Sequence, residues 1–432
     1  MKKAIRFYVS MALILSLAFL AGCGGSNSAN NGGSDDTNST STNGENVTLT
    51  LYSTMLDDRE REAYEEIISD FEAETGIKVD VNFPGDNYED QLRVKMAAKD
   101  LPDLFDTHGW AIQRYGEYTA DLSDMDWVEH LDEALYPVLK DDSGKVHALP
   151  LNQAKDGIMY NATLLDEYGI EVPTTVDEWI QAMEQVKEKS GGEVTPLWIP
   201  GNNHYAFARI LDRLSTPLLV TDEEHNFSES LLDGTFDWSN YTLLPEKLLE
   251  MKEKGLLNAD ALTANDAQLV DLMAQGKIAF TFVAGASLGP AVTEINPEIK
   301  VGVMPVPAFW EGDDPSWIGG ERYTVAAFKD SKHLEEAKQF IEFVARPENM
   351  QKLANATQLP SGLTNVTTDN YYNEYFEKWK HIQVQPYFDR VYLPSGMFDV
   401  YATTGQELVA GILTPEQVSQ KMEEEYHRLR EQ

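Results

Sequence analysis

The chain has 432 residues and a formal net charge of -38 at pH 7, with 72 acidic residues against 34 basic ones. Such a surface repels phosphate backbones and anionic lipid headgroups, which argues against a nucleic-acid-binding protein and against a peripheral membrane helix. The single cysteine excludes a framework of intramolecular disulfides, so the fold must rely on a buried core, and the length suffices for two domains.

The N-terminal segment predicts export. Basic residues among the first six positions precede an apolar run at 9–20, which has the length of a signal-peptide core and is too short for a comfortable membrane span. The run ends in Leu-Ala-Gly-Cys at Cys23, which resembles the lipobox of bacterial lipoproteins. We therefore expect a signal peptide over 1–22 and a lipid on Cys23. An ordinary secretory signal followed by a chance cysteine is the alternative.

A polar segment follows the cysteine. Residues 24–46 consist almost wholly of Gly, Ser, Asn, Thr and Asp. This composition cannot bury apolar surface, so we expect a disordered tether over 23–45. A lipid on Cys23 and such a tether would hold a folded body just above a membrane.

The folded body begins with a strand–helix–strand pattern. Apolar residues alternate over 47–51, fall at helical spacing over 64–71 and alternate again over 77–83. This pattern is typical of a βαβ unit and predicts a parallel sheet. A further helix is expected over 87–99, followed by a short strand-like run at 101–105.

Polar and aromatic residues follow two of these predicted strands. Ligands of open α/β sheets bind at the carboxyl ends of the strands. Tyr52 and the segment 107–110, which contains His108 and Trp110, are therefore the first places to look for a site.

A later helix is marked by its N-terminal cap. Thr175 and Glu178 form a capping box, and the apolar residues from Val176 to Val186 lie along one helical face. We expect Trp179, which lies on this face, to belong to the core.

Several segments, taken in order, resemble a known family. LTLYS, FEAETGIKVDVNF and AAKDLPDLFDTHGWAIQRYGEYTADLSD look like the N-terminal lobe of the extracellular solute-binding proteins that serve ABC sugar importers. HALP, IMYN and TTVDEW are similar to that family's first hinge crossing and the start of its second lobe, and SWIGGERYTV and LPSGLT resemble the later crossings.

The resemblance implies an α/β fold of the periplasmic-binding-protein type II, with two lobes, three hinge crossings and a ligand cleft between the lobes. The implied N-terminal lobe comprises 46–153 and 321–362. The implied C-terminal lobe comprises 154–320 and 363–432.

The strand ends, the polar loop around Asn203 and the positions that the resemblance places at the cleft together give a set of candidate ligand-binding residues. These are Tyr52, His108, Trp110, Asn152, Gln153, Trp198, Asn203, His204, Ser287, Trp317, Gly319, Gly320, Glu321, Arg322 and Phe398. The loop that contains Ser287 lacks the aromatic residue often found there in the family.

Structural interpretations stay open for part of this set. Trp198, Asn203 and His204 fit a capped turn with a packed indole as well as a sugar contact. The paired glycines 319–320 fit a turn into the next strand, and Phe398 fits a core position.

The implied function is binding of a mono- or oligosaccharide and its delivery, by hinge closure, to the permease subunits of an ABC importer. The resemblance implies no catalytic residue, no metal or other cofactor, and a monomer held at the outer face of the cell membrane by the lipid on Cys23. A secreted carbohydrate-active enzyme remains an alternative, since sequence does not give the carboxylate separation that glycosidase chemistry requires. A sensor subunit or a binder of a non-sugar solute on the same fold is a further alternative.

Overall fold

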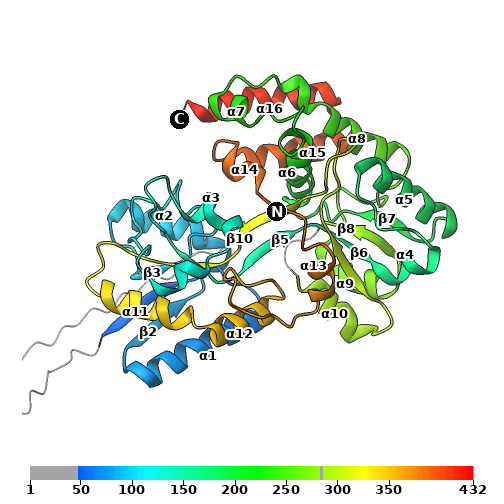
Figure 1. The fold of residues 1–432 in the computed structure, drawn as a ribbon. Coiled ribbons are helices and arrows are strands. Elements are labelled where there is room, and N and C mark those ends of the chain that lie inside the picture. The colour runs from blue at the N-terminus through cyan, green and yellow to red at the C-terminus, as the bar shows by residue number, and fades with distance from the viewer. Residues whose placement is uncertain (1–46, 283–285, 432) are drawn as a thin grey trace, which may run out of the picture. The chain divides into compact units, whose positions relative to one another are not determined.

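Three β-sheets organise the part of the chain that the computed structural model describes, residues 47–282 and 286–431 (Figure 1). The predicted signal peptide, the lipidated Cys23 and the predicted tether lie outside the described residues. Across those residues, no helix has the combination of length and hydropathy that a membrane crossing requires.

The first sheet confirms the βαβ prediction. Its strand order is β2-β1-β3-β11-β4, with β1 parallel to both β2 and β3. The strands are β1 (Thr48–Tyr52), β2 (Lys78–Asn82), β3 (Leu104–Phe105), β11 (Thr324–Ala327) and β4 (Leu149–Pro150). Leu49 and Leu51 are fully buried while Thr48 and Thr50 are exposed, as alternation in a half-covered strand requires.

Helix α1 (Asp58–Thr75) makes the crossover between β1 and β2. Asp57 caps its N-terminus by accepting a hydrogen bond from the Arg59 N–H, and Gly76 ends it in the left-handed conformation. The other helices of this part are α2 (Tyr88–Ala98), α3 (Tyr136–Leu139), α11 (Leu334–Val344) and α12 (Pro347–Thr357). The expected helix over 87–99 is thus confirmed as α2.

A second sheet has the strand order β7-β8-β6-β9. Its strands are β7 (Thr195–Trp198), β8 (Ile278–Thr281), β6 (Ile158–Asn161) and β9 (Val301–Met304). The helices around it are α4 (Ala162–Tyr168), α5 (Val176–Lys189), α6 (Ala206–Leu219), α7 (Ser228–Asp233), α8 (Leu243–Glu253), α9 (Leu269–Ala274), α10 (Leu288–Ile295), α13 (Asn373–Lys378), α14 (Phe388–Val391), α15 (Met397–Ala410) and α16 (Pro415–Arg430).

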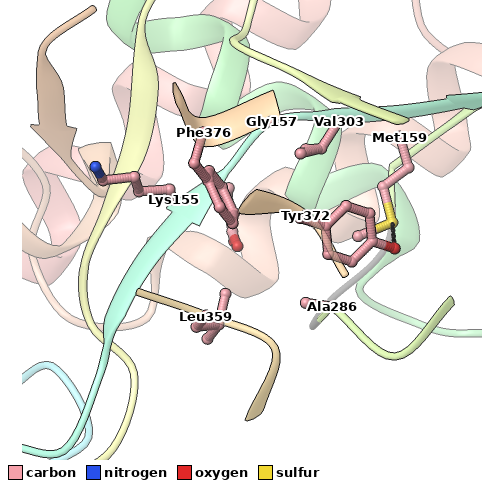
Figure 2. Close-up of a pocket in the computed structure, with 9 residues that line it drawn as sticks. Lys155, Gly157, Met159, Ala286, Val303, Leu359, Tyr372 and Phe376 are labelled. Carbon is pink, nitrogen blue, oxygen red and sulfur yellow. Dashed lines mark hydrogen bonds between the residues drawn. The ribbon is translucent and has the colours of Figure 1, made fainter. Parts of the chain in front are cut away.

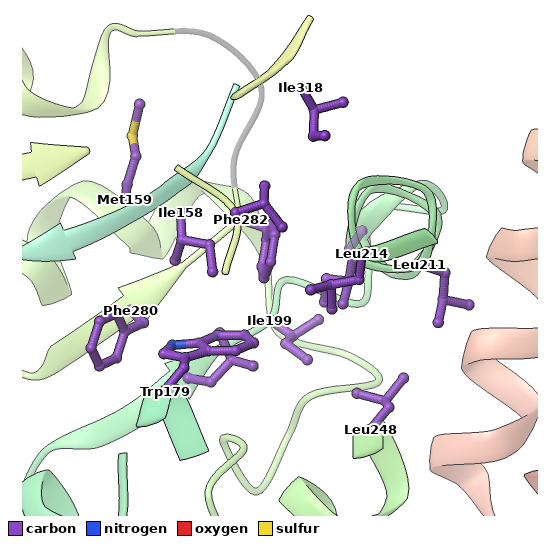
Figure 3. Packing of buried hydrophobic residues seen from close by; sticks show 14 of the residues in the cluster. Ile158, Met159, Trp179, Ile199, Leu211, Leu214, Leu248, Phe280, Phe282 and Ile318 are labelled. Carbon is purple, nitrogen blue, oxygen red and sulfur yellow. The ribbon is translucent and has the colours of Figure 1, made fainter. Parts of the chain in front are cut away.

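Helix α5 covers this second sheet as its sequence predicts. Both hydrogen bonds of the capping box between Thr175 and Glu178 are formed. Trp179 is fully buried and meets the rings of Phe280 and Phe282 edge to face, with centroids 6.2 and 5.7 Å away (Figure 3). The prediction that Trp179 is a core residue is confirmed.

A third sheet connects the two others. It has the order β12-β10-β5, built from β12 (Val384–Pro386), β10 (Trp317–Glu321) and β5 (Gln153–Asp156). Strands β5 and β10 are antiparallel, and Gln153 is paired with Glu321. We call this sheet the hinge sheet.

The two glycines of β10, Gly319 and Gly320, lie where this strand pairs with β5. A Cβ added to Gly319 would lie 1.8 Å from the carbonyl oxygen of Ala154, so a side chain there would prevent the strands from meeting. Gly320 has a φ of 154° and faces Val138. The neighbouring strand fills the place where a Cβ would lie, and an approach of the Gly319 backbone to a ligand stays a prediction.

The described residues form two separate hydrophobic cores. One is built from residues within 49–151 and 323–353 together with Leu363, and the other from residues within 158–318 and 372–426 together with Leu359. The chain passes from one core to the other near 152–157 and near 319–322. It passes a last time between Leu363 of the first core and Tyr372 of the second. The fold thus consists of two lobes, which we call the N-lobe and the C-lobe.

The core position of Trp179 generates a stability prediction. Trp179→Ala leaves a cavity against Phe280 and Phe282, and we expect a loss of about 3–5 kcal/mol in the free energy of unfolding of the C-lobe. Urea denaturation followed by circular dichroism measures it. Val94→Ala, at a side chain that is 69% exposed, should change stability by less than about 0.5 kcal/mol. Equal effects of the two substitutions would contradict the assignment.

Candidate ligand-binding site

Polar side chains that lack partners gather on and beside the hinge sheet. Glu321 is fully buried, and neither of its carboxylate oxygens has a hydrogen-bond partner among the described residues. The side-chain nitrogens of Asn152 and Gln153 are likewise enclosed without an acceptor in this part of the chain. Buried polar groups are normally paired, so this concentration of unpaired groups marks a place where a polar ligand would supply the partners.

Asp156 ties the hinge sheet to the C-lobe. Its carboxylate forms an ion pair with the guanidinium of Arg213 on α6 and accepts a hydrogen bond of 2.9 Å from the hydroxyl of Tyr387. Burial alone would raise the pKa of Asp156, but the charges of Arg213 and Arg322 outweigh it and lower the pKa below the usual value. Asp156 is therefore ionised at neutral pH and fixes both partners in place.

Helix α14 brings the C-lobe against the N-lobe. The side-chain amide of Gln113 donates a hydrogen bond of 2.7 Å to the carbonyl oxygen of Arg390. A Cβ at Gly109 would lie 2.0 Å from Nη1 of Arg390, so glycine is needed for this approach. The guanidinium of Arg390 also lies over the ring of Tyr387, 4.1 Å from its centroid.

His108 lies in the same loop and is held by Asp106. The Asp106 carboxylate accepts hydrogen bonds from the backbone N–H groups of His108 and Thr324, at 2.9 and 3.0 Å. Burial, followed by the charges of Arg390 and Arg322, lowers the pKa of His108 to about 3. Its Nδ1 is enclosed without a partner among the described residues, so this neutral imidazole offers a free donor or acceptor.

Trp110 and Tyr52 occupy different settings. Trp110 is partly buried, and the guanidinium of Arg114 lies 4.4 Å from the centroid of its ring. Tyr52 has the ammonium of Lys95 at 5.2 Å from its ring centroid. It lines a hollow formed by N-lobe residues, including Asp80, so the structure does not bring Tyr52 together with the polar groups of the hinge sheet.

Two of the predicted tryptophans are core residues. Trp317 is fully buried and Trp198 is 3% exposed. Trp317 packs on Phe376 at 5.6 Å between ring centroids and donates its indole N–H to the carbonyl of Trp379 at 3.3 Å. Both residues belong to the C-lobe core, which agrees with the packed-indole alternative for Trp198, and a ligand contact of either residue stays a prediction.

The segment before α6 forms a turn beside an exposed aromatic group. Asn203 donates from its amide to Asp266 at 2.6 Å and accepts the backbone N–H of Tyr205 at 3.0 Å, so this side chain is used by the turn. The ring of Tyr205 lies 4.9 Å from that of His204 and 5.5 Å from that of Phe398. His204 and Phe398, expected from the sequence, are thus brought together by Tyr205, which was not expected.

Both lobes contribute to one hollow beside the hinge sheet. Ser287 of the C-lobe lines it together with Arg322 and the beginning of α1. On its floor the hydroxyl of Tyr323 donates to Glu60 at 2.7 Å. Ser287 and Arg322, both expected from the sequence, therefore lie in a common depression.

A smaller cavity lies along β5 (Figure 2). Its lining includes Met159, Leu359, Tyr372 and Phe376, and its volume is about 20 Å³. Such a volume accommodates roughly one water molecule and no sugar ring. This cavity is a packing feature of the C-lobe.

Sequence reasoning missed the C-lobe groups of the site. Asp156, Arg213, Tyr387 and Arg390 stand outside every motif that we quoted. The available signal was on α6, where the neighbouring charged residues Asp212 and Arg213 lie on a helix that is buried on nearly all sides.

Comparison with known proteins decides the family. Residues 57–351 match the model of the bacterial extracellular solute-binding protein family. The chain belongs to this family. The expected fold, α/β with two lobes, is confirmed by the same match and by the solved structures it resembles.

Three similar proteins are informative. The melibiose/raffinose/stachyose-binding protein MelE of Bacillus subtilis (strain 168) is 55% identical over 386 residues, which cover 89% of this chain and 90% of MelE. A binding protein of Bacillus subtilis, solved in an open conformation, is 55% identical with a TM-score of 0.86, over 89% of this chain and 98% of that one. A sugar transporter protein of Bacillus licheniformis, solved with stachyose, is 60% identical with a TM-score of 0.80, over 89% of this chain and all of that one.

The setting of His108 generates a pH prediction. Because its folded-state pKa of about 3 lies below the ordinary value of 6.5, its imidazole should stay neutral at pH 5. The stability that this neutral form provides is fully present above about pH 6.5 and is lost as the pH falls toward 3. Nitrogen-15 NMR of the ring at pH 5 measures the protonation state. A protonated ring at that pH, or an unchanged acid stability profile in His108→Gln, would contradict the assignment.

Proposed function

We propose that this protein binds α-galactoside-type oligosaccharides such as melibiose, raffinose and stachyose and presents them to an ABC importer. The observation that carries the proposal is the 55% identity, over 89% of the chain, to a protein named for binding these three sugars. The 60% identity to a protein solved with stachyose supports the same ligand class. ABC-importer permease subunits are the partner that membership of the family supports.

The chemistry of the hinge region supports a sugar ligand. Pyranose hydroxyls both donate and accept hydrogen bonds. The carboxylate of Glu321 has acceptor oxygens without a partner, and the side-chain amides of Asn152 and Gln153 have N–H donors without one, among the described residues. Tyr205 is 41% exposed and forms, with Phe398, a surface on which the C–H face of a sugar ring can pack.

The proposed mechanism is closure about the hinge sheet. Ligand held between the N-lobe and the C-lobe stabilises the closed state by contacts that the open state cannot make, and the importer recognises that state. The division of the cores supports lobe boundaries close to 46–153 with 321–362 and 154–320 with 363–432.

The proposal extends to the location and the absence of catalysis. We infer a binding protein rather than an enzyme, since MelE is named for sugar binding and the similar Bacillus licheniformis protein for sugar transport. We also infer that the protein is a monomer and that a lipid on Cys23 anchors it outside the cytoplasm. Tethering beside the permease would raise the effective concentration of loaded protein at its partner.

Calorimetric titration tests the ligand class. We expect the protein to bind raffinose and stachyose with the sugar recovered intact, and to bind maltose much more weakly. Tyr205→Ala removes the proposed stacking surface, worth about 1 kcal/mol, and should weaken raffinose binding roughly fivefold. Tyr168→Ala, on α4, serves as the matched control and should bind normally. Hydrolysis of the sugar, or no heat with any carbohydrate, would overturn the proposal.

The anchor is tested by replacing the cysteine. Cys23→Ser removes the thiol that would carry the lipid, and we expect the variant to move from the membrane fraction to the soluble exported fraction. Cell fractionation followed by immunoblotting measures this. A variant that stays fully membrane-bound would refute the lipid anchor.

A further inference from the structure

A large hollow on the N-lobe is not used by the proposed function. Its volume is about 600 Å³, against about 20 Å³ for the cavity along β5, and none of its lining residues belongs to the hinge sheet. Ligand pockets typically enclose roughly 300–1,000 Å³, so this hollow has room for a mono- or disaccharide. Tyr52 is among the residues that line it. We call it the N-lobe hollow.

The N-lobe hollow lies at the carboxyl ends of two parallel strands. Tyr52 is the last residue of β1 and Asn82 the last residue of β2, and the register of the sheet pairs them. Leu101 and Pro102, which are both buried and precede β3, also line the hollow. Ligands of open α/β sheets bind outside the carboxyl ends of the strands, so this position is typical of a binding site.

Two aromatic rings line the N-lobe hollow, and each has a cationic group beside it. The ammonium of Lys95 lies 5.2 Å from the centroid of Tyr52, and the guanidinium of Arg61 lies 5.2 Å from the centroid of Phe83. All four side chains are partly buried and line the hollow. A pyranose has a C–H face that packs on an aromatic ring and hydroxyls around its edge that accept hydrogen bonds. An aromatic ring with a donor beside it offers both contacts.

Acidic and amide side chains supply hydrogen-bond acceptors. Asp80, Asn82 and Asp100 are exposed and line the same hollow. Among the described residues, neither carboxylate has an ion-pair partner within 4.0 Å. Their oxygens are therefore available to the O–H donors of a polyhydroxyl ligand.

The charge of the lining indicates the class of ligand. Arg61 and Lys95 are basic and Asp80 and Asp100 are acidic, so the lining has no formal net charge. A site that selects an anion or a cation is expected to carry an excess of the opposite charge. A balanced lining with aromatic rings, donors and acceptors, in a chain with a net charge of -38, favours a neutral polyhydroxyl ligand.

The edge of the sheet argues against a peptide strand as the occupant. β2 is the edge strand beside the hollow, and a peptide that extended the sheet would pair with its backbone. The Val79 N–H, however, already donates to the carboxylate of Glu72 at 2.9 Å. The ammonium of Lys78 contacts the same carboxylate at 2.7 Å. The chain itself thus covers part of this edge, and side chains are left to recognise a ligand.

We propose that the N-lobe hollow is a second carbohydrate-binding site, which takes a neutral mono- or disaccharide against the rings of Tyr52 and Phe83. The hydroxyls of the sugar accept hydrogen bonds from Lys95 and donate them to Asp80. This inference goes beyond the proposed function, because the second site needs no contact with the hinge sheet and no hinge closure. Since its acceptors are exposed to water, we expect the second site to bind sugar more weakly than the cleft does.

Calorimetric titration with melibiose tests the second site. The full-length protein, in a detergent without a sugar headgroup, should bind two molecules of melibiose in a tight step and a weak step. Tyr52→Ala should weaken the weak step at least fivefold, since it removes an aromatic contact worth about 1 kcal/mol. Tyr136→Ala is the matched control. Tyr136 is a partly buried N-lobe tyrosine with the ammonium of Lys140 at 5.1 Å from its ring centroid, but it does not line the hollow.

A second variant keeps the test decisive if Tyr52→Ala does not fold. Asp80→Ala removes an exposed acceptor from β2 and should weaken the weak step about tenfold. Asp124→Ala, at an N-lobe side chain that is 77% exposed outside the hollow, is its control and should leave the weak step unchanged. Thermal unfolding verifies that each variant is folded.

Two results overturn the second site. One is saturation of the unsubstituted protein by a single molecule of melibiose. The other is a weak step that is as strong in Tyr52→Ala and Asp80→Ala as in their two controls. Failure of the proposed function gives a different result: the tight step is absent, while a weak step that depends on Tyr52 and Asp80 still supports the second site.

Discussion

The antiparallel pairing of β5 with β10 is the contact on which the rest of the site depends. These strands join the N-lobe to the C-lobe, and their close approach at Gly319 leaves no room for a side chain against the carbonyl of Ala154. The register places Gln153 beside Glu321 at the point where the two lobes meet. A hinge built as a sheet fixes the floor of the cleft while the lobes on either side keep separate cores.

Electrostatics then shapes this floor. The ion pair between Asp156 and Arg213 contributes little to stability by itself, because both groups had to leave water. The ion pair instead fixes positions. Together with the hydroxyl of Tyr387, it holds the start of α14 against the hinge sheet. Arg390 can then reach the N-lobe loop at Gly109 and Gln113. The candidate binding residues are thereby held in place by contacts within the protein, and such preorganisation lowers the entropic cost of binding.

Local features of the fold follow from the sequence because they depend on near neighbours. The alternation in β1, the crossover helix α1 and the capping box at Thr175 are each formed as their residues predict. The same holds for Trp179, whose place on an apolar helical face is enough to assign it to a core.

For the candidate site, the residues predicted from the sequence agree only in part with the groups that the structure brings together. His108, Glu321 and Arg322 were predicted and lie among the polar groups of the hinge. Trp198 and Trp317 were also predicted, and both are packed in the C-lobe core, because an indole at the end of a strand suits either role until its neighbours are known. Arg213 and Arg390, which motifs did not mark, are among the groups that define the site.

The sequence by itself determined the class of fold, the family and the approximate loops that border the cleft, since these depend on periodicity and ordered motifs. The tertiary structure alone decided which polar side chains share one environment. Asp156, Arg213 and Tyr387 are far apart in the chain and meet only because three elements converge on the hinge sheet. Periodicity indicates which face of an element is buried, but the group opposite that face, and with it the local charge and pKa, is set by packing between distant segments.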